Sequence, residues 1–321
     1  MTQHENNKSK MTRREMLAAT GLTAGLIGAT ALSLGETQAF AASEQPKKRR
    51  FALNTGTLLG YNLSIEEEID ATAKAGYDGI EIWLMRLEKY LEEGKSLADL
   101  KKRIDDSGLT VEGAIGFANW IVDDDAVRAR GLEQMRRDMG RLAQIGCRCI
   151  AAPASGATNK RIEDLEACGA RYRKILEIGE QEGVTPLLEQ WGPSATLSRL
   201  SDVAAIAVAA KHPNASLLLD AYHLYKGGND FVSLNQLNGR TMRVFHLNDY
   251  PANPPRETIA DKDRVFPGDG VCPFGVLLPT LDAIGFSGAF SLELFNREYQ
   301  EKYAPLELAK IGLEKMQAIF A

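Results

Sequence analysis

The stretch SLLLDAYH, residues 216–223, joins a short apolar run to an acidic residue and a histidine. Such a run, bounded by polar residues, is typical of a strand that is buried on both faces of a parallel sheet. The pattern returns in LLEQWG at 187–192, VFHLND at 244–249 and SLELF at 291–295. In an α/β barrel, a polar residue that ends such a strand lies at the mouth where the active site forms. These stretches therefore predict both a fold and a site.

Outward from these stretches, β-type runs alternate with helical-period segments along the chain. We predict eight strands: Phe51–Thr55, Gly79–Trp83, Thr110–Ile115, Arg148–Pro153, Val184–Gln190, Ser216–Asp220, Arg243–Leu247 and Gly288–Leu294. Eight βα units of about 35 residues each match the size of a (β/α)8 barrel, one domain. A doubly wound open sheet is the alternative, although NTGTLLG at 54–60 lacks the glycine pattern of a dinucleotide-binding turn.

The predicted helices carry apolar residues at three- and four-residue spacings, as in Asp124–Gly146. A glycine stands where a helix should stop before the next strand, at Gly76, Gly108, Gly146, Gly183 and Gly285. Glycine is the usual residue at such helix ends because it adopts the left-handed conformation at little cost. The positions of these glycines support the division of the chain into βα units.

Composition places the chain among ordinary globular proteins. It has 321 residues, 44% of them hydrophobic and 25% charged, with a net charge of −5 and a pI near 5.6. No segment gathers the Lys and Arg stripe that binding to a phosphate backbone requires. We therefore expect no nucleic-acid partner, and a small molecule is the expected ligand.

Residues 1–41 have the three parts of an export signal. A polar start carries the pair Arg13-Arg14, an uncharged run covers Met16–Leu34, and small residues precede Ala42. The paired arginines favour a twin-arginine signal, with the Tat translocase as a transient partner and a periplasmic or secreted location. A retained membrane anchor is the alternative, although Gly and Thr dilute the run, so no stable anchor is expected. A basic linker, 42–50, would precede the barrel at 51–321.

The four cysteines do not suggest a disulfide framework, although export would bring the protein to an oxidising compartment. Cys147 and Cys149 are too close along one strand for an unstrained bridge, and no pair has the spacing of a zinc site. We expect all four, Cys168 and Cys272 included, to be buried free thiols.

Four strand ends supply a candidate metal site, formed by Glu189, Asp220, His246 and Glu293. Three carboxylates and one imidazole among apolar neighbours would repel each other and lose their charge without a cation. Three oxygen donors and one nitrogen favour one divalent ion, manganese first, with magnesium, cobalt or zinc as alternatives.

The ordered Glu, Asp, His and Glu on strands five to eight resemble the xylose-isomerase-like TIM barrel superfamily of sugar isomerases and epimerases. The resemblance extends to Asp220-x-x-His223, to His246-x-x-Asp249 and to the turn PGDG at 267–270. Inosose dehydratases, hydroxypyruvate isomerases and ketose 3-epimerases share this barrel, as does endonuclease IV. Endonuclease IV needs a richer set of metal ligands than four histidines in the whole chain allow. The resemblance is strong for the fold and the metal site and weak for the substrate.

This resemblance implies roles for single residues. Glu189, Asp220, His246 and Glu293 match the metal ligands, and Glu189 and Glu293 also match the acid/base pair. His223 matches a contact to a substrate hydroxyl. Arg264 matches an arginine that holds substrate oxygens, although its spacing to the turn is one residue longer than in the epimerases. The implied partner is a sugar or keto-sugar, and a homo-oligomer is left open.

The expected chemistry is proton transfer through a cis-enediolate, with a carboxylate on each face of the substrate. The product could be an isomer, an epimer or, by loss of a β-hydroxyl, a dehydrated keto-sugar, so a lyase is the alternative enzyme. A non-catalytic carbohydrate-binding protein is the second alternative. Aromatic residues after strand ends could form an apolar wall or be plain packing: Trp83, Phe117, Trp120 and Trp191. Glu81 could reach the mouth or form an ion pair inside the barrel.

Overall fold

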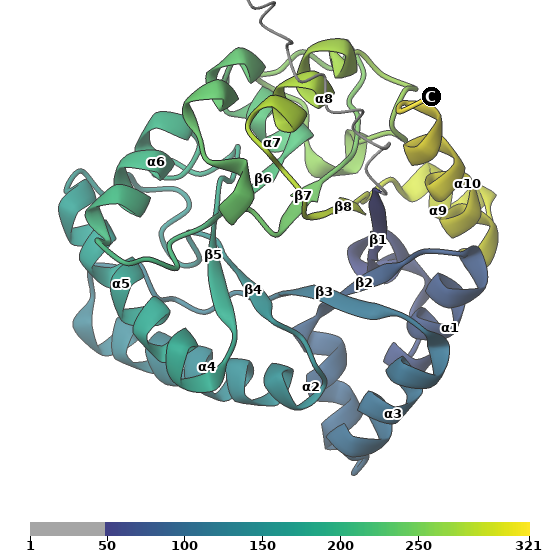
Figure 1. The fold of residues 1–321 in the computed structure, drawn as a ribbon, viewed down its shortest axis with the longest axis horizontal. Coiled ribbons are helices and arrows are strands. Elements are labelled where there is room, and N and C mark those ends of the chain that lie inside the picture. The colour runs from purple at the N-terminus through teal and green to yellow at the C-terminus, as the bar shows by residue number, and fades with distance from the viewer. Residues whose placement is uncertain (1–48) are drawn as a thin grey trace, which may run out of the picture. The chain divides into compact units, whose positions relative to one another are not determined.

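The structure is a computed structural model that describes residues 49–321, so the predicted signal peptide and most of the basic linker lie outside the described residues. Eight parallel strands close into a barrel in the order of the chain (Figure 1). The strands are β1 Arg50–Asn54, β2 Gly79–Trp83, β3 Thr110–Ile115, β4 Cys149–Ala152, β5 Thr185–Glu189, β6 Leu217–Asp220, β7 Val244–His246 and β8 Ala289–Leu292. The predicted (β/α)8 barrel is confirmed, and the open sheet is excluded because β1 pairs with β8.

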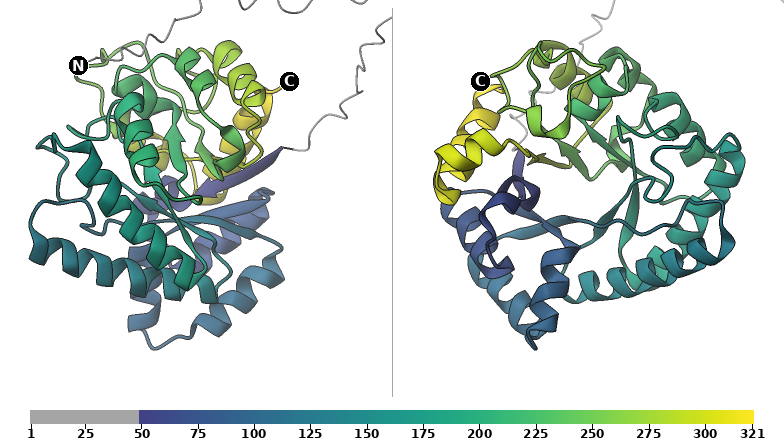
Figure 2. Two further views of the ribbon diagram at one scale, coloured as in Figure 1. Left: turned by 60° about the vertical axis from the view of Figure 1, so that its left-hand side comes forward. Right: turned by 180° about the vertical axis from the view of Figure 1, so that it is seen from behind.

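Helices surround the barrel on its outside (Figures 1 and 2). They are α1 Ile65–Ala75, α2 Leu84–Glu92, α3 Leu97–Ser107, α4 Asp125–Gln144, α5 Leu165–Glu182, α6 Leu200–Ala209, α7 Ala221–Lys226, α8 Phe274–Ala283, α9 Arg297–Lys302 and α10 Pro305–Ala318. Polar caps begin several of them; the Asp124 carboxylate, for example, accepts from the backbone N–H of Val127 at the start of α4. All five glycines predicted at helix ends have positive φ, which confirms those boundaries.

The first strand ends one residue earlier than predicted. The side chain of Asn54 accepts a hydrogen bond from the backbone N–H of Gly56 at 2.9 Å. This local bond turns the chain into a 3-10 helix, Thr55–Tyr61. Asn54 thereby becomes a polar residue at the carboxyl end of β1, in the same position as the predicted site residues on their strands.

The apolar core has two parts. The larger part lies between strands and helices, and the smaller part fills the barrel interior with Ile115, Cys149, Ala151, Leu187, Leu218 and Val244. Toward the carboxyl ends of the strands, buried polar side chains replace this apolar filling: Asn54, Glu81, Glu189, Asp220, His246 and Glu293. The interior is therefore apolar over part of its height and charged at the mouth.

The four cysteines are free and buried, as predicted. Burial raises the pKa of Cys147 to about 12, so this thiol stays protonated at neutral pH. Among the described helices, none combines the length and the apolar character needed to span a membrane.

Candidate active site

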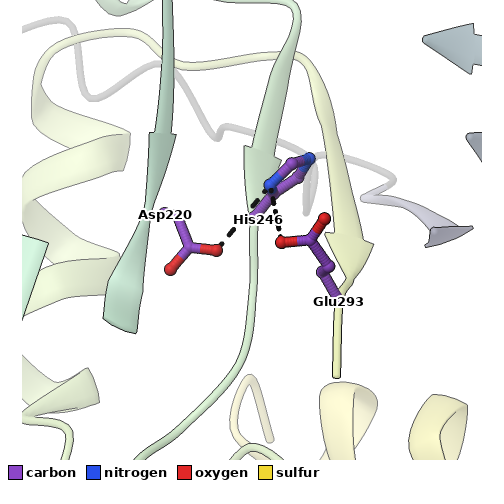
Figure 3. Close-up of side chains that lie close together, drawn as sticks. All are labelled: Asp220, His246 and Glu293. Atoms are coloured by element: carbon purple, nitrogen blue, oxygen red, sulfur yellow. Dashed lines mark ion pairs between the residues drawn. The ribbon is translucent and has the colours of Figure 1, made fainter. Parts of the chain in front are cut away.

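The predicted site residues stand at equivalent places on neighbouring strands. Glu189, Asp220 and His246 are the last residues of β5, β6 and β7, and Glu293 directly follows β8. The register pairs Asp220 with His246, which puts both strand ends at one level. Figure 3 shows the side chains of Asp220, His246 and Glu293 converging on one another.

Three of these side chains form a compact set of donors. Ligand atoms of Asp220, His246 and Glu293 all lie within 4.8 Å of one another. The Nδ1 atom of His246 lies 3.4 Å from Oε2 of Glu293 and 3.7 Å from Oδ2 of Asp220. This nitrogen is buried and makes no hydrogen bond with any described residue. A buried nitrogen without a hydrogen-bond partner, facing two carboxylate oxygens, fits a divalent ion that takes mixed oxygen and nitrogen ligands.

Mutual charge sets the protonation of this group. Burial by itself lowers the pKa of His246, but Glu293 and Glu81 beside it raise the value well above the ordinary one. Burial by itself raises the pKa of Glu293, but His246 and Arg264 hold the value below the ordinary range. Each group is thus kept charged by its neighbours, and a metal ion would replace the proton on Nδ1.

Glu189 lies beside this donor set and lines the same cavity as Glu293. It does not belong to the group of atoms within 4.8 Å of one another. Burial raises the pKa of Glu189 to about 8, and the negative charges of Glu293 and Asp220 act in the same direction. Its predicted roles as a fourth ligand and as one member of the acid/base pair both stay predictions.

Arg264 brings a permanent positive charge to the carboxylates. Its Nη1 atom donates to Glu293 at 2.7 Å and to Asp220 at 3.2 Å, and the guanidinium also contacts Asp261. The rings of Tyr222 and Phe295 flank the guanidinium, with centroids 4.5 Å and 5.1 Å from its central carbon. The longer spacing noted in the sequence does not keep Arg264 away from the site.

The imidazole ring of His223 is neutral and carries its proton on Nδ1. Its backbone N–H donates to Asp220 at 2.9 Å, and its Nε2 lies 3.1 Å from Nη2 of Arg264. Because the guanidinium can only donate, Nε2 accepts and the ring proton resides on Nδ1. Burial lowers the pKa of His223 to about 3, so the ring is neutral at pH 7. Nδ1 has no hydrogen-bond partner among the described residues, although the ring lines the cavity.

A cavity of about 490 Å³ opens over these groups. One side is aromatic: the rings of Trp83 and Phe117 lie 5.5 Å apart, and those of Trp83 and Phe295 lie 5.9 Å apart. Trp191 also lines the cavity, together with the charged side chains Asp261, Lys262, Arg264 and Arg297. Trp120 does not, because it is fully buried and donates to the carbonyl of Pro153. Of the two alternatives for Trp120, plain packing is correct.

Two asparagines that were not among the predicted site residues orient the acids. Asn248 donates to Asp220 at 2.9 Å and accepts from the backbone N–H of Tyr222. Asn54 donates to Glu293 at 3.0 Å. A polar residue at a strand end was the signal used for the four predicted ligands, and the same signal applied to β1 would have found Asn54.

Asp249, the last residue of the predicted His246-x-x-Asp249 motif, acts on the backbone. Its carboxylate accepts from the N–H groups of Gly268, Gly270 and Cys272 at 2.8–3.0 Å. A Cβ at Gly270 would lie 2.3 Å from the carbonyl oxygen of Tyr250, so only glycine fits there. The turn at 267–270 is therefore fastened to the segment that follows β7.

Comparison with known proteins places this geometry in a family. Residues 69–319 match the family model described as the xylose isomerase-like TIM barrel. An inosose isomerase of Bacillus velezensis is 27% identical over 277 residues, which cover 84% of this chain and 96% of that protein. A 3-dehydroshikimate dehydratase of Pseudomonas aeruginosa is 26% identical over 242 residues, 73% of this chain and 36% of that protein.

A solved structure is also similar. The IolI protein, crystallised with a bound zinc atom, has a TM-score of 0.78 and 25% identity, over 84% of this chain and 97% of that one. These matches confirm the resemblance inferred from the motifs.

Proposed function

We propose that this chain, which belongs to the xylose isomerase-like TIM barrel family, is a metal-dependent sugar isomerase or epimerase. The observation that carries the proposal is one cavity in which two buried carboxylates, Glu189 and Glu293, lie beside the donor atoms of Asp220 and His246. A protein that only binds sugars needs an apolar wall and polar contacts. It has no need of two carboxylates at a cation site.

The residues of the site would have separate roles in metal binding and in proton transfer. Asp220, His246 and Glu293, with Glu189 as the fourth predicted ligand, would hold one divalent ion. When bound, the ion supplies positive charge to a carbonyl oxygen and the neighbouring hydroxyl oxygen. One glutamate takes a proton from the carbon next to the carbonyl, which leaves a cis-enediolate. Return of a proton to the neighbouring carbon interconverts aldose and ketose, and return to the opposite face of the same carbon gives the epimer.

Other residues would place the substrate. The Nδ1–H of His223 has no hydrogen-bond partner among the described residues and its ring lines the cavity, so we assign it to a sugar hydroxyl. Arg264 lies against both Asp220 and Glu293, so a substrate oxygen held by the guanidinium would lie next to the acid/base pair. Trp83, Phe117 and Trp191 offer an apolar surface for one face of a sugar ring. The volume lies within the range of about 300–1,000 Å³ that is usual for small-molecule sites.

Dehydration of a keto-sugar or keto-inositol is the second candidate. The similarity to a 3-dehydroshikimate dehydratase favours it, because elimination begins with the same removal of a proton next to a carbonyl. The cavity also presents the cations Lys262 and Arg297, which suit a substrate with an acidic group.

The identity of the metal is part of the proposal. Two carboxylates and one imidazole suit manganese, the ion favoured by the sequence, and also zinc, which the similar IolI structure contains. We therefore propose a divalent ion, and metal analysis of the purified protein would identify it.

The deciding experiment is proton exchange in D₂O. The protein, loaded in turn with Mn²⁺, Co²⁺, Mg²⁺ and Zn²⁺, is incubated with inososes, ketohexoses, hydroxypyruvate and 3-dehydroshikimate, and carbon-bound deuterium is followed by NMR. We expect deuterium on a carbon next to the carbonyl of one substrate. Glu189→Gln and Glu293→Gln should lose this exchange at measured metal occupancy, whereas Glu112→Gln, on a buried strand glutamate paired with Arg50, should retain it.

Two outcomes would contradict the proposal. A substrate that is turned over at full metal occupancy without carbon-bound deuterium would indicate a metal used only to activate water. Sugar binding with neither turnover nor exchange for any metal would leave the non-catalytic alternative.

We also propose export by the twin-arginine pathway, which rests on Arg13-Arg14 and the uncharged run that follows. The double variant Arg13→Lys, Arg14→Lys should accumulate as unprocessed protein in the cytoplasm. Normal export of this variant would contradict the twin-arginine interpretation.

A further inference from the structure

Glu81 is a buried carboxylate without a role in the proposed proton transfer. It lies in the middle of β2, is 2% exposed, and crosses the barrel interior toward β7. Its Oε2 atom is 3.0 Å from Nε2 of His246. This is the ring nitrogen opposite the one that faces Asp220 and Glu293.

The fold makes room for this contact. The pairing of β2 with β3 shifts register between Ile80 and Glu81, which sets Glu81 opposite Gly113. A Cβ at Gly113 would lie 2.6 Å from Oε1 of Glu81, too close unless the carboxylate moves. The carboxylate thus occupies a space that a glycine leaves open, in a layer where barrels normally carry bulky apolar residues.

Asn54 ties Glu81 to a second member of the donor set. Its amide nitrogen donates to Glu293 at 3.0 Å and to Glu81 at 3.4 Å. Its amide oxygen accepts from the indole N–H of Trp83 at 2.8 Å and from the backbone N–H of Gly56. These two donors fix which way the amide points. One network therefore joins the aromatic wall of the cavity, two carboxylates and the imidazole.

We propose that Glu81 is a positioning residue that keeps a proton on Nε2 of His246 and so directs the lone pair of Nδ1 toward the cation site. A histidine binds a metal through an unprotonated nitrogen, and a carboxylate on its other nitrogen fixes both the tautomer and the orientation of the ring. Asn54 holds Glu81 and Glu293 in their relative places. The inference rests on the proposed function only for the presence of a cation beside His246.

Metal affinity gives the test without any substrate. Dissociation constants for Zn²⁺ and Mn²⁺ are measured by competition with a chelator for wild type, Glu81→Gln and Glu112→Gln. Loss of a carboxylate behind a ligating histidine typically weakens metal binding by about 10–100-fold. We expect this loss for Glu81→Gln. Glu112→Gln is the matched control because Glu112 is also a buried strand glutamate, but its carboxylate pairs with Arg50 rather than with a histidine.

A spectroscopic signature separates positioning from a general structural role. In the zinc-loaded wild type, the Nε2–H proton of His246 should appear in nitrogen-correlated NMR spectra at low field, protected from solvent by Glu81. In Glu81→Gln it should move upfield or exchange. Unchanged metal affinity in folded Glu81→Gln would overturn the inference.

Gly113→Ala provides the second variant if Glu81→Gln does not fold. Its Cβ displaces the Glu81 carboxylate without removing it, so metal binding should weaken in the same direction and by less. Unchanged affinity there would overturn the inference as well. A wild type that binds neither ion would instead contradict the proposed function. Failure of the Glu81 inference and failure of the proposed function are therefore distinguishable.

Discussion

Two groups of buried charged residues in this barrel differ in how well their acidic and basic side chains balance each other. The first, the acid cluster, comprises Glu81, Glu189, Asp220, His246 and Glu293, so that four carboxyl groups face two cations, the imidazole of His246 and the guanidinium of Arg264. The second is the pair of Glu68 on α1 with Arg86 on α2, at 3.1 Å, with side chains 0% and 8% exposed. Both groups are equally hidden from water, but only the first has an excess of one charge.

The difference teaches that burial of charge does not by itself mark a site. The Glu68 pair is closed in charge: one acid meets one base, and Arg86 also donates to the carbonyl of Leu59, although Oε2 of Glu68 has no hydrogen-bond partner among the described residues. The acid cluster is open: its carboxyl groups outnumber its cations, and a cavity lies beside it. An excess of acidic groups and an adjoining cavity are therefore the features that support the proposed cation and substrate.

The largest expected effect is on stability at the closed pair. Arg86→Met leaves Glu68 buried without its base and should lower the free energy of unfolding by about 3–5 kcal/mol, with or without metal. Arg264→Met also removes a buried base, but a divalent ion can offset that loss. Urea unfolding with saturating Mn²⁺ and with chelator measures both. An equal metal response of the two variants would remove the distinction between the groups.

The second-largest expected effect is on turnover. Glu189→Gln should reduce turnover by about 10²-fold or more, since a positioned acid or base is lost. Glu68→Gln makes the same change at an equally buried place and should keep turnover within about twofold at temperatures where it is folded. Steady-state rates of both variants and the wild type, corrected for metal content, measure this difference. Comparable losses in both variants would show that the effect reflects general damage to the fold.

Removal of metal should then destabilise the wild type. An ion present at 100 times its dissociation constant stabilises the folded state by about 2.7 kcal/mol, and chelation would remove this contribution. Calorimetric melting with and without chelator should show the shift in the wild type and in Glu68→Gln. It should be absent in Asp220→Ala, which lacks a ligand. A full shift in Asp220→Ala would mean that the ion binds elsewhere.

The smallest effect is a pH dependence of stability from the closed pair. Burial raises the pKa of Glu68 from 4.5 to about 7, against the opposing influence of Arg86. Because the folded-state pKa lies above the unfolded one, this carboxyl favours folding most below pH 4.5, and the benefit is lost as the pH rises to about 7. The free energy of unfolding should therefore fall by about 2 kcal/mol between pH 5 and pH 8.

Glu68→Gln serves as the reference for that pH dependence, since Gln does not titrate. The difference in unfolding free energy between wild type and variant is measured by urea titration at both pH values. A difference that does not change with pH would mean that Glu68 keeps its ordinary pKa.

Much of the barrel followed from local pattern. Apolar runs between amphipathic segments predicted all eight strands to within two residues at either end, because parallel strands are buried on both faces and leave a strong signal. Glu189, Asp220, His246 and Glu293 were found because each ends such a run. The chemistry of the donors also predicted a cation before any geometry was known.

The roles inside the barrel could not be predicted in the same way. Glu81 interrupts an apolar strand, and its sequence neighbours do not say whether its carboxylate meets an arginine, water or a histidine 165 residues away. Trp120 and Trp83 both follow or end strands, yet one packs into the core and the other lines the cavity. Such choices depend on which residues the other strands place opposite.

The sequence by itself determined the number and order of the βα units and the donors that end strands five to eight, because these are properties of short segments. Only the tertiary structure decided that Asp220, His246 and Glu293 form one set of donors while Glu189 stands beside it. It also decided that Arg264 reaches the carboxylates, and that Gly113 leaves room for Glu81 behind the imidazole. The reason is physical: the closure of the barrel and the register between strands fix these distances, and neither is encoded in any one segment of the chain.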